Sequence, residues 1–413
     1  MTTVDVLAQY HNYVSTLTHQ WSAYGNYTYT NIIVQNTFST VWNASYQCVL
    51  NTNTFIAAIN NSGAVVPDER KKLLLGEAYA MRAFLHFDML RLFGPVYATD
   101  SNLVSIPYSS FATEEIQPLL PAKTVMDSVL KDLGRAENLL QHDPVRTDGV
   151  VPTTGIDVIG DFYKLRNRRL NYYAVMALKA RALLYRGDKA AALQAAKSVI
   201  SEAGRWFPWS PAALSNPGIA DPDRTFSSEV IFGVQNFDMY AVQRTSFAAP
   251  LALNIILAPT VARLAEIYEN NENDYRLRVN WGSAASSGKT FKTFIKYDDV
   301  INKTPLFRNF QPLIRMSELY YIAAECSPVK SDGIAFLNTV RQNRGLIALT
   351  TAAEFPLEIT KEYKKEFYGE GQLFFYYKRM NTASVLNGSS TQSVALNPAK
   401  YVVPLPLTET QNR

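Results

Sequence analysis

The sequence predicts a mostly α-helical protein in which tetratricopeptide-like helix pairs form a right-handed scaffold that carries long irregular loops and a few short strands. Two observations predict this fold class: apolar residues recur at helical spacing in several long stretches, and two of these stretches contain an internal turn. A hydrophobic fraction of 47% and a charged fraction of 18% are typical of a folded globular chain. We expect a single domain over residues 1–413.

The first long helix is predicted over residues 69–93. Its apolar and small residues recur every three or four positions, which places them on one face of a helix. They are Leu73, Gly76, Ala80, Ala83, Phe84, Phe87 and Leu90. Gly94 and Pro95 then favour the end of the helix. Residues 123–141 repeat the pattern and predict a second helix.

Two later stretches predict helix pairs. Residues 171–204 predict two helices joined by a turn at 186–188, with small and large residues placed as in a tetratricopeptide hairpin. Residues 313–346 predict a similar pair, with its turn around 331–333. The two units are irregular and widely separated, so we expect no regular solenoid.

Long irregular segments separate the helices and hold most of the Pro, Gly, Asn and Ser residues. They are residues 22–37, 95–122, 143–169, 205–258 and 281–312. Long loops in compact domains usually carry function. Short strands are predicted at 228–237 and 292–297.

The sequence contains no motif for nucleophilic, nucleotide-dependent or zinc chemistry. The acidic pairs Glu114-Glu115 and Asp298-Asp299 could be read as acid and base of a glycosidase. Adjacent residues usually point apart, however, which favours solvated surface acids. Two cysteines and four histidines form no spaced set of metal ligands. We therefore expect no enzymatic activity, no cofactor and no metal site.

Charge and hydropathy argue against two further classes of protein. The net charge is +4 without any basic run, so nucleic acid is a poor partner. No stretch of roughly 18 apolar residues predicts a transmembrane helix. Cys48 and Cys326 could form a disulfide, but their separation and the usual burial of cysteine favour two buried free thiols.

Residues 76–94, GEAYAMRAFLHFDMLRLFG, closely resemble the signature helix of the SusD/RagB family. The family pattern has a Glu-Ala pair, an Arg-Ala pair one turn later, a Phe-Asp stretch and Arg-Leu-Phe-Gly before a loop. Here these elements are Glu77-Ala78, Arg82-Ala83, Phe87-Asp88 and Arg91-Leu92-Phe93-Gly94.

Further segments are similar to the family pattern in the same order along the chain. They are the Trp-and-Tyr helix at 41–53, helices at 127–140 and 177–188, the strand at 228–234, the pair Asp274 and Arg276, the helix pair at 313–346, the Gly-Glu-Gly segment at 366–381 and the tail at 401–412. Gln372 departs from the pattern, because many members carry Arg there, and Tyr376-Tyr377 replace a common Asp-Leu pair. The loop at 327–333 is also short. These departures indicate a divergent subgroup.

The resemblance implies a nutrient-binding lipoprotein on the outer surface of Bacteroidetes-type bacteria. Four tetratricopeptide-like helix pairs would support a loop-built surface that captures an oligosaccharide. The protein would act as a lid over a SusC-like TonB-dependent transporter in the outer membrane. Members of the family are anchored by lipid on an N-terminal cysteine after a signal peptide. No cysteine lies near Met1, so we expect a chain from which the signal peptide and that cysteine have been removed.

The stretch YGNYTYTN at residues 24–31 is the first candidate ligand site. The C–H face of a sugar ring stacks on aromatic rings and its hydroxyls pair with amides, which Tyr, Trp, Asn and Gln supply. The resemblance places ligand contacts in this loop and in later loops. The candidate residues are Tyr24, Asn26, Tyr27, Tyr29, Asn31, Gln35, Trp206, Trp209 and Trp281. The alternating Tyr and Thr at 27–30 are also typical of an edge strand or of a rim packed on helices. Trp42 and His86 are expected to be packing residues.

Three other functions stay open from the sequence. The chain could be a peptide-binding member of the same family, which would bind peptides and no glycans. It could be a glycoside hydrolase or lyase, which would need two acids converging in an aromatic cleft. It could also be a helical scaffold that only holds the transporter, in which case the loop aromatics would pack on a protein partner.

Overall fold

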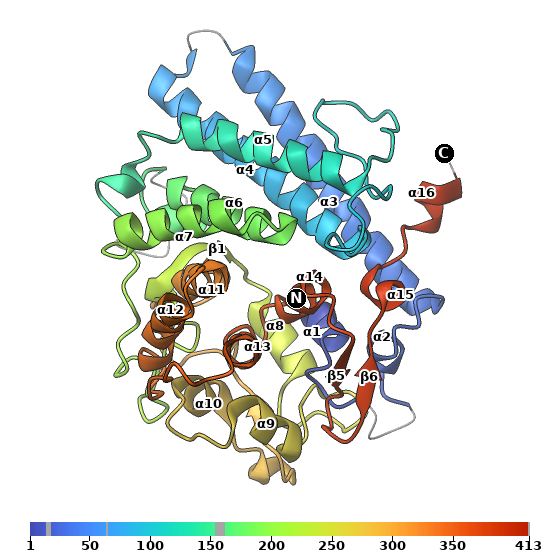
Figure 1. Ribbon diagram of the computed structural model, residues 1–413, viewed down its shortest axis with the longest axis vertical. Helices are drawn as coiled ribbons and strands as arrows, with labels where there is room; N and C mark the ends of the chain where they lie inside the picture. The colour runs from blue at the N-terminus through green and yellow to red at the C-terminus, as the bar shows by residue number, and fades with distance from the viewer. Residues whose placement is uncertain (14–17, 63–64, 153–161, 412–413) are drawn as a thin grey trace.

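The computed structural model describes residues 1–13, 18–62, 65–152 and 162–411, and its regular structure is mostly helical (Figure 1). The helices are α1 (Thr2–Leu7), α2 (Ser22–Gly25), α3 (Ile32–Asn60), α4 (Asp68–Phe93), α5 (Ala122–Leu139), α6 (Tyr172–Arg186), α7 (Lys189–Ala203), α8 (Met239–Ser246), α9 (Val261–Tyr268), α10 (Tyr275–Asn280), α11 (Met316–Cys326), α12 (Lys330–Gln342), α13 (Phe355–Glu366), α14 (Leu373–Arg379), α15 (Pro398–Tyr401) and α16 (Leu407–Gln411). The strands are β1 (Val230–Gln235), β2 (Trp281–Gly282), β3 (Thr293–Phe294), β4 (Phe310–Arg315), β5 (Ser384–Leu386) and β6 (Ser393–Ala395).

The long helices form one continuous stack. Each packs on the next in the order α3, α4, α5, α6, α7, α11 and α12. Figure 1 shows the stack running from α3–α5 through α6 and α7 to α11 and α12, with α9 and α10 at the opposite end of the molecule. This arrangement confirms the predicted scaffold of tetratricopeptide-like helix pairs.

The helices α4, α6 and α7 follow the predicted pattern closely. The helix predicted at 69–93 is α4, and it ends at Gly94 as expected. The pair predicted at 171–204 is α6 and α7, separated at Gly187, whose φ of 93° is a left-handed conformation that glycine adopts without strain. Asp188 then caps α7, because its carboxylate accepts a hydrogen bond from the Ala191 amide at 3.2 Å.

The pair predicted at 313–346 differs from the structure in two details. Residues 313–315 belong to strand β4, and α11 begins only at Met316. The predicted turn at 331–333 was wrong, since these residues lie inside α12. Gly333 is there because α11 passes close by: a Cβ atom at this position would lie 2.7 Å from the Ala324 carbonyl oxygen. In the sequence, a glycine that permits close packing cannot be distinguished from a glycine in a turn.

The irregular segment predicted at 22–37 is also shorter than expected. It contains the short helix α2, and α3 already begins at Ile32. The Asn31 side chain accepts a hydrogen bond from the Ile33 amide at 2.9 Å and so caps this helix. The helix α3 buries Val34, Phe38, Trp42, Val49, Asn53 and Ile56 on one face and exposes the other.

The strands pair into two-stranded antiparallel sheets in the described part of the chain. The strand predicted at 228–237 is β1, which pairs with β4, and the strand predicted at 292–297 is β3, which pairs with β2. The hairpin β5–β6 was not predicted.

Residues near the start of the described chain dock on its last part. The Tyr10 hydroxyl donates to the Lys364 carbonyl at 2.8 Å, and the Gly371 amide donates to the Asp5 carboxylate at 3.0 Å. Burial raises the pKa of Asp5 to about 7. Tyr29 lies further along and donates to the Lys400 carbonyl at 2.6 Å.

A buried network of ion pairs connects β4, α10, α12 and α13. Its central residue is Glu366, which is fully buried and pairs with Arg276 at 2.8 Å, with Arg344 at 2.7 Å and with Arg315. Burial opposes ionisation of Glu366, but the three guanidinium groups, led by Arg344, hold its pKa well below its ordinary value. The carboxylate therefore stays charged in the interior.

The network accounts for motif residues that the sequence singled out. Asp274 both caps α10 and binds the Arg276 guanidinium through two hydrogen bonds of 2.9 and 2.7 Å. Glu370 of the Gly-Glu-Gly segment pairs with Arg315 at 2.8 Å and with Lys296. These side chains are all buried, so their role is to join the elements of the fold.

Candidate functional site

Two adjoining hollows follow the solvent side of α3, and together we call them the α3 groove. The first, of about 400 Å³, lies between the start of α3 and the C-terminal segment 403–408. The second, of about 470 Å³, lies between the middle of α3 and the loop 107–117. Asn43 lines both hollows. Figure 1 shows the C-terminal helices α15 and α16 on the same side of the molecule as α3.

The lining of the groove combines amides, hydroxyls and aromatic rings with an apolar wall at 403–407 and with three acidic side chains. The first hollow is lined by Tyr29, Thr30, Gln35, Asn36, Ser39, Asn43 and Thr408, together with Ile32, Phe38 and residues 403–407. The second is lined by Trp42, Asn43, Tyr46, Gln47, Leu50, Pro107, Ser109, Thr113, Glu114, Glu115, Ile116, Gln117 and Glu409. Volumes of this size accommodate small ligands.

The aromatic rings in the groove are held in place by hydrogen bonds and by each other. The rings of Trp42 and Tyr46 lie 4.7 Å apart, one helical turn from each other on α3. The Trp42 indole donates to the Glu409 carboxylate at 3.0 Å, and the Tyr46 hydroxyl donates to the Pro107 carbonyl at 2.9 Å. These contacts connect α3 to both walls of the groove, which fixes the orientation of the rings before a ligand arrives.

The loop 107–117 is anchored from beneath by α3 and α4. The Asn53 amide donates to the Ser109 carbonyl at 3.1 Å and to the Phe111 carbonyl at 3.0 Å. Arg82 donates to the Ser110 carbonyl at 3.0 Å and binds the buried Asp132 carboxylate through two hydrogen bonds of 2.6 and 2.9 Å. One wall of the groove therefore depends on a buried ion pair of the signature helix.

His86 completes this anchor. Its ring stacks on Tyr108 with 4.0 Å between centroids, and its Nε2 accepts a hydrogen bond from the Ser109 amide at 3.1 Å. Nδ1 then carries the proton and donates to the Arg82 carbonyl at 2.8 Å. Full burial lowers the pKa of His86 to about 4, so the imidazole is neutral at physiological pH. His86 is a packing residue, as expected, but it also positions the loop.

Of the residues predicted in the 24–35 stretch, Tyr29 and Gln35 line the groove. Asn31 caps α3, and Asn26 is exposed outside both hollows. Tyr24 and Tyr27 lie in the core with 6% and 7% of their surface exposed.

Three of the predicted rings, those of Tyr24, Tyr27 and Trp281, are buried in the structure, and their role as ligand platforms stays a prediction. The Tyr24 hydroxyl lies 2.7 Å from the Thr37 hydroxyl, and the Tyr27 hydroxyl donates to the Leu7 carbonyl at 2.6 Å. Trp281 is 4% exposed and donates to the Tyr268 hydroxyl at 3.2 Å. Their polar atoms have partners within the protein, so these three rings pack the core and present no free face.

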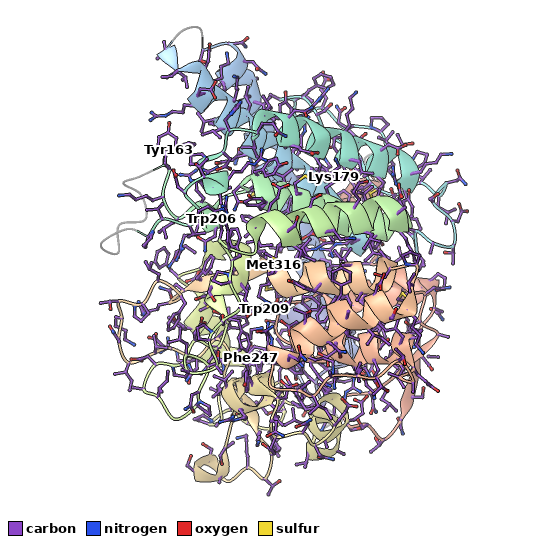
Figure 2. The ribbon with its side chains drawn as sticks, turned by 60° about the vertical axis from the view of Figure 1, so that its left-hand side comes forward. Tyr163, Lys179, Trp206, Trp209, Phe247 and Met316 are labelled. Atoms are coloured by element: carbon purple, nitrogen blue, oxygen red, sulfur yellow. The ribbon has the colours of Figure 1, made fainter. Side chains whose placement is uncertain are left out.

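The predicted tryptophans at 206 and 209 lie on the segment between α7 and β1 and line neither hollow (Figure 2). Trp206 covers Gly149 and has the Arg205 guanidinium over its ring at 4.5 Å. Trp209 packs against Tyr320, with 5.2 Å between centroids. Both are half-buried by these contacts, so the structure does not bring them together with Tyr29 and Gln35.

The sequence reasoning missed the amides Asn36, Asn43 and Gln47. They lie on the exposed side of α3, in a region that was partly assigned to a loop. The available signal was the repetition of amide residues at helical spacing opposite the buried stripe. Trp42 was correctly expected in the core, yet it also forms part of the groove wall.

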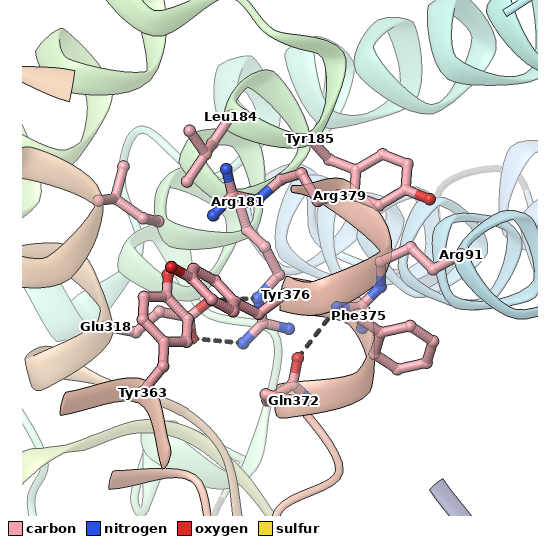
Figure 3. A pocket seen from close by; sticks show the side chains of 11 residues that line it. Arg91, Arg181, Leu184, Tyr185, Glu318, Tyr363, Gln372, Phe375, Tyr376 and Arg379 are labelled. Atoms are coloured by element: carbon pink, nitrogen blue, oxygen red, sulfur yellow. Dashed lines mark hydrogen bonds and ion pairs between the residues drawn. The ribbon is translucent and has the colours of Figure 1, made fainter. Parts of the chain in front are cut away.

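A much smaller cavity lies where α4, α6, α11, α13 and α14 converge (Figure 3). Its volume is about 30 Å³, which is enough for about one or two water molecules and too small for a sugar ring. Gln372, one of the departures from the family pattern, lies here and accepts a hydrogen bond from Arg91 at 2.9 Å. The Arg91 guanidinium stacks over the Phe375 ring at 4.1 Å. The cavity is part of the packing of the scaffold.

The acidic pairs show no catalytic arrangement in the described residues. Glu114 and Glu115 are exposed neighbours on the loop 107–117. Asp299 pairs with Arg308 at 3.0 Å and with Lys303 at 2.7 Å. Partial burial opposes its ionisation, but these two cations hold the pKa of Asp299 at about 2. No cluster of three or more His, Cys, Asp or Glu side chains within the described ranges could hold a metal ion.

Comparison with known families gives two matches. The family model described as starch-binding associating with outer membrane, SusD-like_3, matches residues 2–153. The model of the SusD family, SusD_RagB, matches residues 262–404. A search of curated proteins gives no match.

Solved structures with the same fold cover almost the whole chain. A SusD superfamily protein from Bacteroides thetaiotaomicron is 19% identical with a TM-score of 0.72, covering 99% of this chain and 96% of its own. A laminarin-binding SusD-like protein is 15% identical with a TM-score of 0.68, covering 99% and 92%. Surface glycan-binding protein A from Bacteroides uniformis is 17% identical with a TM-score of 0.66, covering 91% and 83%. None of the described helices is long and apolar enough to cross a membrane.

Proposed function

The chain belongs to the SusD/RagB family, and from this premise we propose that it captures oligosaccharides in the α3 groove and delivers them to a TonB-dependent transporter. The protein would act without chemistry, as a lipid-anchored component of the outer surface of the outer membrane. Its SusC-like partner would receive the ligand from the groove.

The composition of the α3 groove is the observation that supports this proposal. Side chains that both donate and accept hydrogen bonds line both hollows, and Asn43 lies where the hollows meet. The rings of Trp42, Tyr46 and Tyr29 lie among these groups. Such a surface matches a saccharide, which alternates apolar C–H faces with hydroxyl groups.

The strength of binding follows from the same composition. Each neutral hydrogen bond contributes only about 1 kcal/mol net, and ligand immobilisation opposes binding. We therefore expect weak affinity for a short saccharide and stronger affinity for one long enough to occupy both hollows. Predicted residues that line neither hollow, such as Trp206 and Trp209, would contribute only if the ligand extends beyond the groove.

The test is affinity electrophoresis and calorimetry of the full chain against neutral plant, fungal and algal polysaccharides, host glycans and peptides. Asn43→Ala removes an amide shared by both hollows and is expected to weaken glycan binding about five-fold, the equivalent of one hydrogen bond. Asn60→Ala is the matched control, because Asn60 is an exposed amide at the far end of the same helix.

The outcomes separate the alternatives. Retardation by a glycan that Asn43→Ala weakens and Asn60→Ala leaves unchanged supports the proposal. Binding of peptides without any glycan would assign the chain to a peptide-binding branch. Turnover of a glycan would contradict the absence of chemistry, and no binding at all would contradict capture in the groove.

A further inference from the structure

We propose that the α3 groove selects uncharged glycans, and that Glu114 and Glu115 exclude glycans that carry carboxylate or sulfate groups. This inference rests on the proposed function and adds the chemical class of its ligand. It follows from the distribution of charge around the groove.

The helix that forms the floor of the groove carries no charge. The chain contains no Asp, Glu, Lys or Arg between Val6 and Pro67, although such residues make up 18% of the whole sequence. The side chains that α3 presents to the hollows are amides and hydroxyls such as Asn36, Asn43 and Gln47. These groups pair with sugar hydroxyls but offer no counter-charge to an anionic substituent.

Within the described ranges, the charged residues that line the groove are all acidic. Glu114 and Glu115 lie on the loop 107–117, and Glu409 lies in α16. Among the described residues, no lysine or arginine lines either hollow. Glu409 accepts the hydrogen bond from the Trp42 indole, whereas Glu114 and Glu115 are exposed and form no ion pair within the described chain.

The cation that contacts the loop 107–117 from beneath is already neutralised. Arg82 is buried, and its guanidinium binds the Asp132 carboxylate through two hydrogen bonds. Its Nη1 donates to the Asn53 amide oxygen and to the Ser110 carbonyl, each at 3.0 Å. Arg82 therefore holds the loop, and each of its three nitrogens donates a hydrogen bond within the protein.

A uronate or a sulfate ester in this groove would meet like charge, and none of the described lining residues would supply a compensating cation. Proteins that bind such groups use Arg or Lys for the purpose. A like unit charge at about 4 Å lowers affinity about five-fold in bulk water, and more where the protein excludes water. Two neighbouring carboxylates at the mouth of the second hollow thus discriminate by charge, while the amides of α3 accept any neutral sugar of suitable shape.

The experiment compares each neutral polysaccharide with a derivative of the same backbone. The probes are laminarin, pullulan and galactomannan, each with its carboxymethyl derivative, together with alginate and dextran sulfate. Affinities are measured for the full chain in about 20 mM and about 300 mM NaCl. The expected result is binding of at least one neutral polymer, with its carboxymethyl derivative at least about ten-fold weaker at low salt and the difference reduced at high salt.

The double variant Glu114→Gln/Glu115→Gln tests whether these two residues cause the discrimination between neutral and acidic glycans. It is expected to raise the affinity for the carboxymethyl derivative, relative to its neutral parent, about ten-fold at low salt. Glu202→Gln on α7, an exposed carboxylate far from the groove, is expected to leave the ratio unchanged.

Two results would overturn the inference while leaving glycan capture intact. One is an acidic glycan that binds as tightly as its neutral parent or more tightly. The other is a double variant that discriminates as strongly as the original chain. If no glycan of either class binds the folded protein, glycan capture itself is refuted and selectivity with it.

Discussion

Protonation of His86 should weaken the fold at mildly acidic pH. The imidazole is buried between Tyr108 and the Arg82 carbonyl, and its pKa is lowered to about 4, against about 6.5 in an unfolded chain. Between these two values the unfolded state binds more protons than the folded state. The stability that His86 contributes is therefore fully present above about pH 6.5 and is lost as the pH falls towards 4.

The size of this effect follows from the two pKa values. A folded pKa of about 4 and an unfolded pKa of about 6.5 correspond to a loss of about 2.5 kcal/mol between pH 7.5 and pH 4.5. Other buried groups titrate in the same range, among them His11, whose pKa burial lowers to about 3. A comparison with His86→Gln removes their contribution, because they are present in both proteins.

The assay is denaturant unfolding of both proteins at pH 7.5, 6.0 and 4.5, which are about the limits and the middle of the titration. Glutamine cannot take up the proton, so the loss of stability in His86→Gln should be smaller by about 2.5 kcal/mol. His142→Gln is the matched control, since His142 is exposed and should leave the slope unchanged. If the unfolding free energy depends on pH equally in the original chain and in His86→Gln, the reasoning is refuted.

Three further predictions concern the packing of the fold. Glu366→Gln leaves three buried guanidinium groups without their shared carboxylate and should cost about 3–5 kcal/mol in unfolding free energy, whereas the exposed Glu202→Gln should cost little. The Lys378 side chain donates to the Arg91 carbonyl at 2.8 Å and to the Gly94 carbonyl at 2.6 Å, at the end of α4. Lys378→Met leaves these carbonyls unpaired and should lower the unfolding free energy by about 1–3 kcal/mol for each. An unchanged unfolding free energy would contradict this prediction. In Gly333→Ala the new Cβ would lie 2.7 Å from the Ala324 carbonyl oxygen. This overpacking should cost about 1–3 kcal/mol of stability and lower the midpoint of thermal unfolding. An unchanged midpoint would show that α11 and α12 can separate at this point.

The sequence predicts the helical scaffold because the determinants of α4, α6 and α7 are local. Apolar spacing, the glycine at 187 and the cap at Asp188 each act within a few residues of their position. Gly333 is an exception, because its role depends on α11, which packs against it across the turn and which a local pattern cannot reveal. The sequence indicates that a small residue is needed but not whether the reason is a turn or a close contact.

The roles of the tyrosines depend on distant partners. The Tyr27 hydroxyl is buried and donates a hydrogen bond to the Leu7 carbonyl, whereas the Tyr29 hydroxyl donates one to the Lys400 carbonyl. No local pattern in YGNYTYTN distinguishes these two environments. The groove is likewise built from α3, the loop 107–117 and the C-terminal segment. Because these segments are far apart in sequence, the groove can be identified only from the tertiary structure.

The docking of the first residues on the last ones has a consequence for the order of events during synthesis. The contacts of Asp5, Tyr10 and Tyr29 with their partners span 366, 354 and 371 residues of chain. The N-terminal segment therefore cannot dock until nearly the whole polypeptide has been synthesised. The helices α4 to α7 can associate earlier, because their contacts are local. Closure of the first hollow, which lies between Tyr29 and residues 403–408, is then among the last steps of folding. A ribosome-bound chain would carry a formed helical scaffold and an unfinished groove.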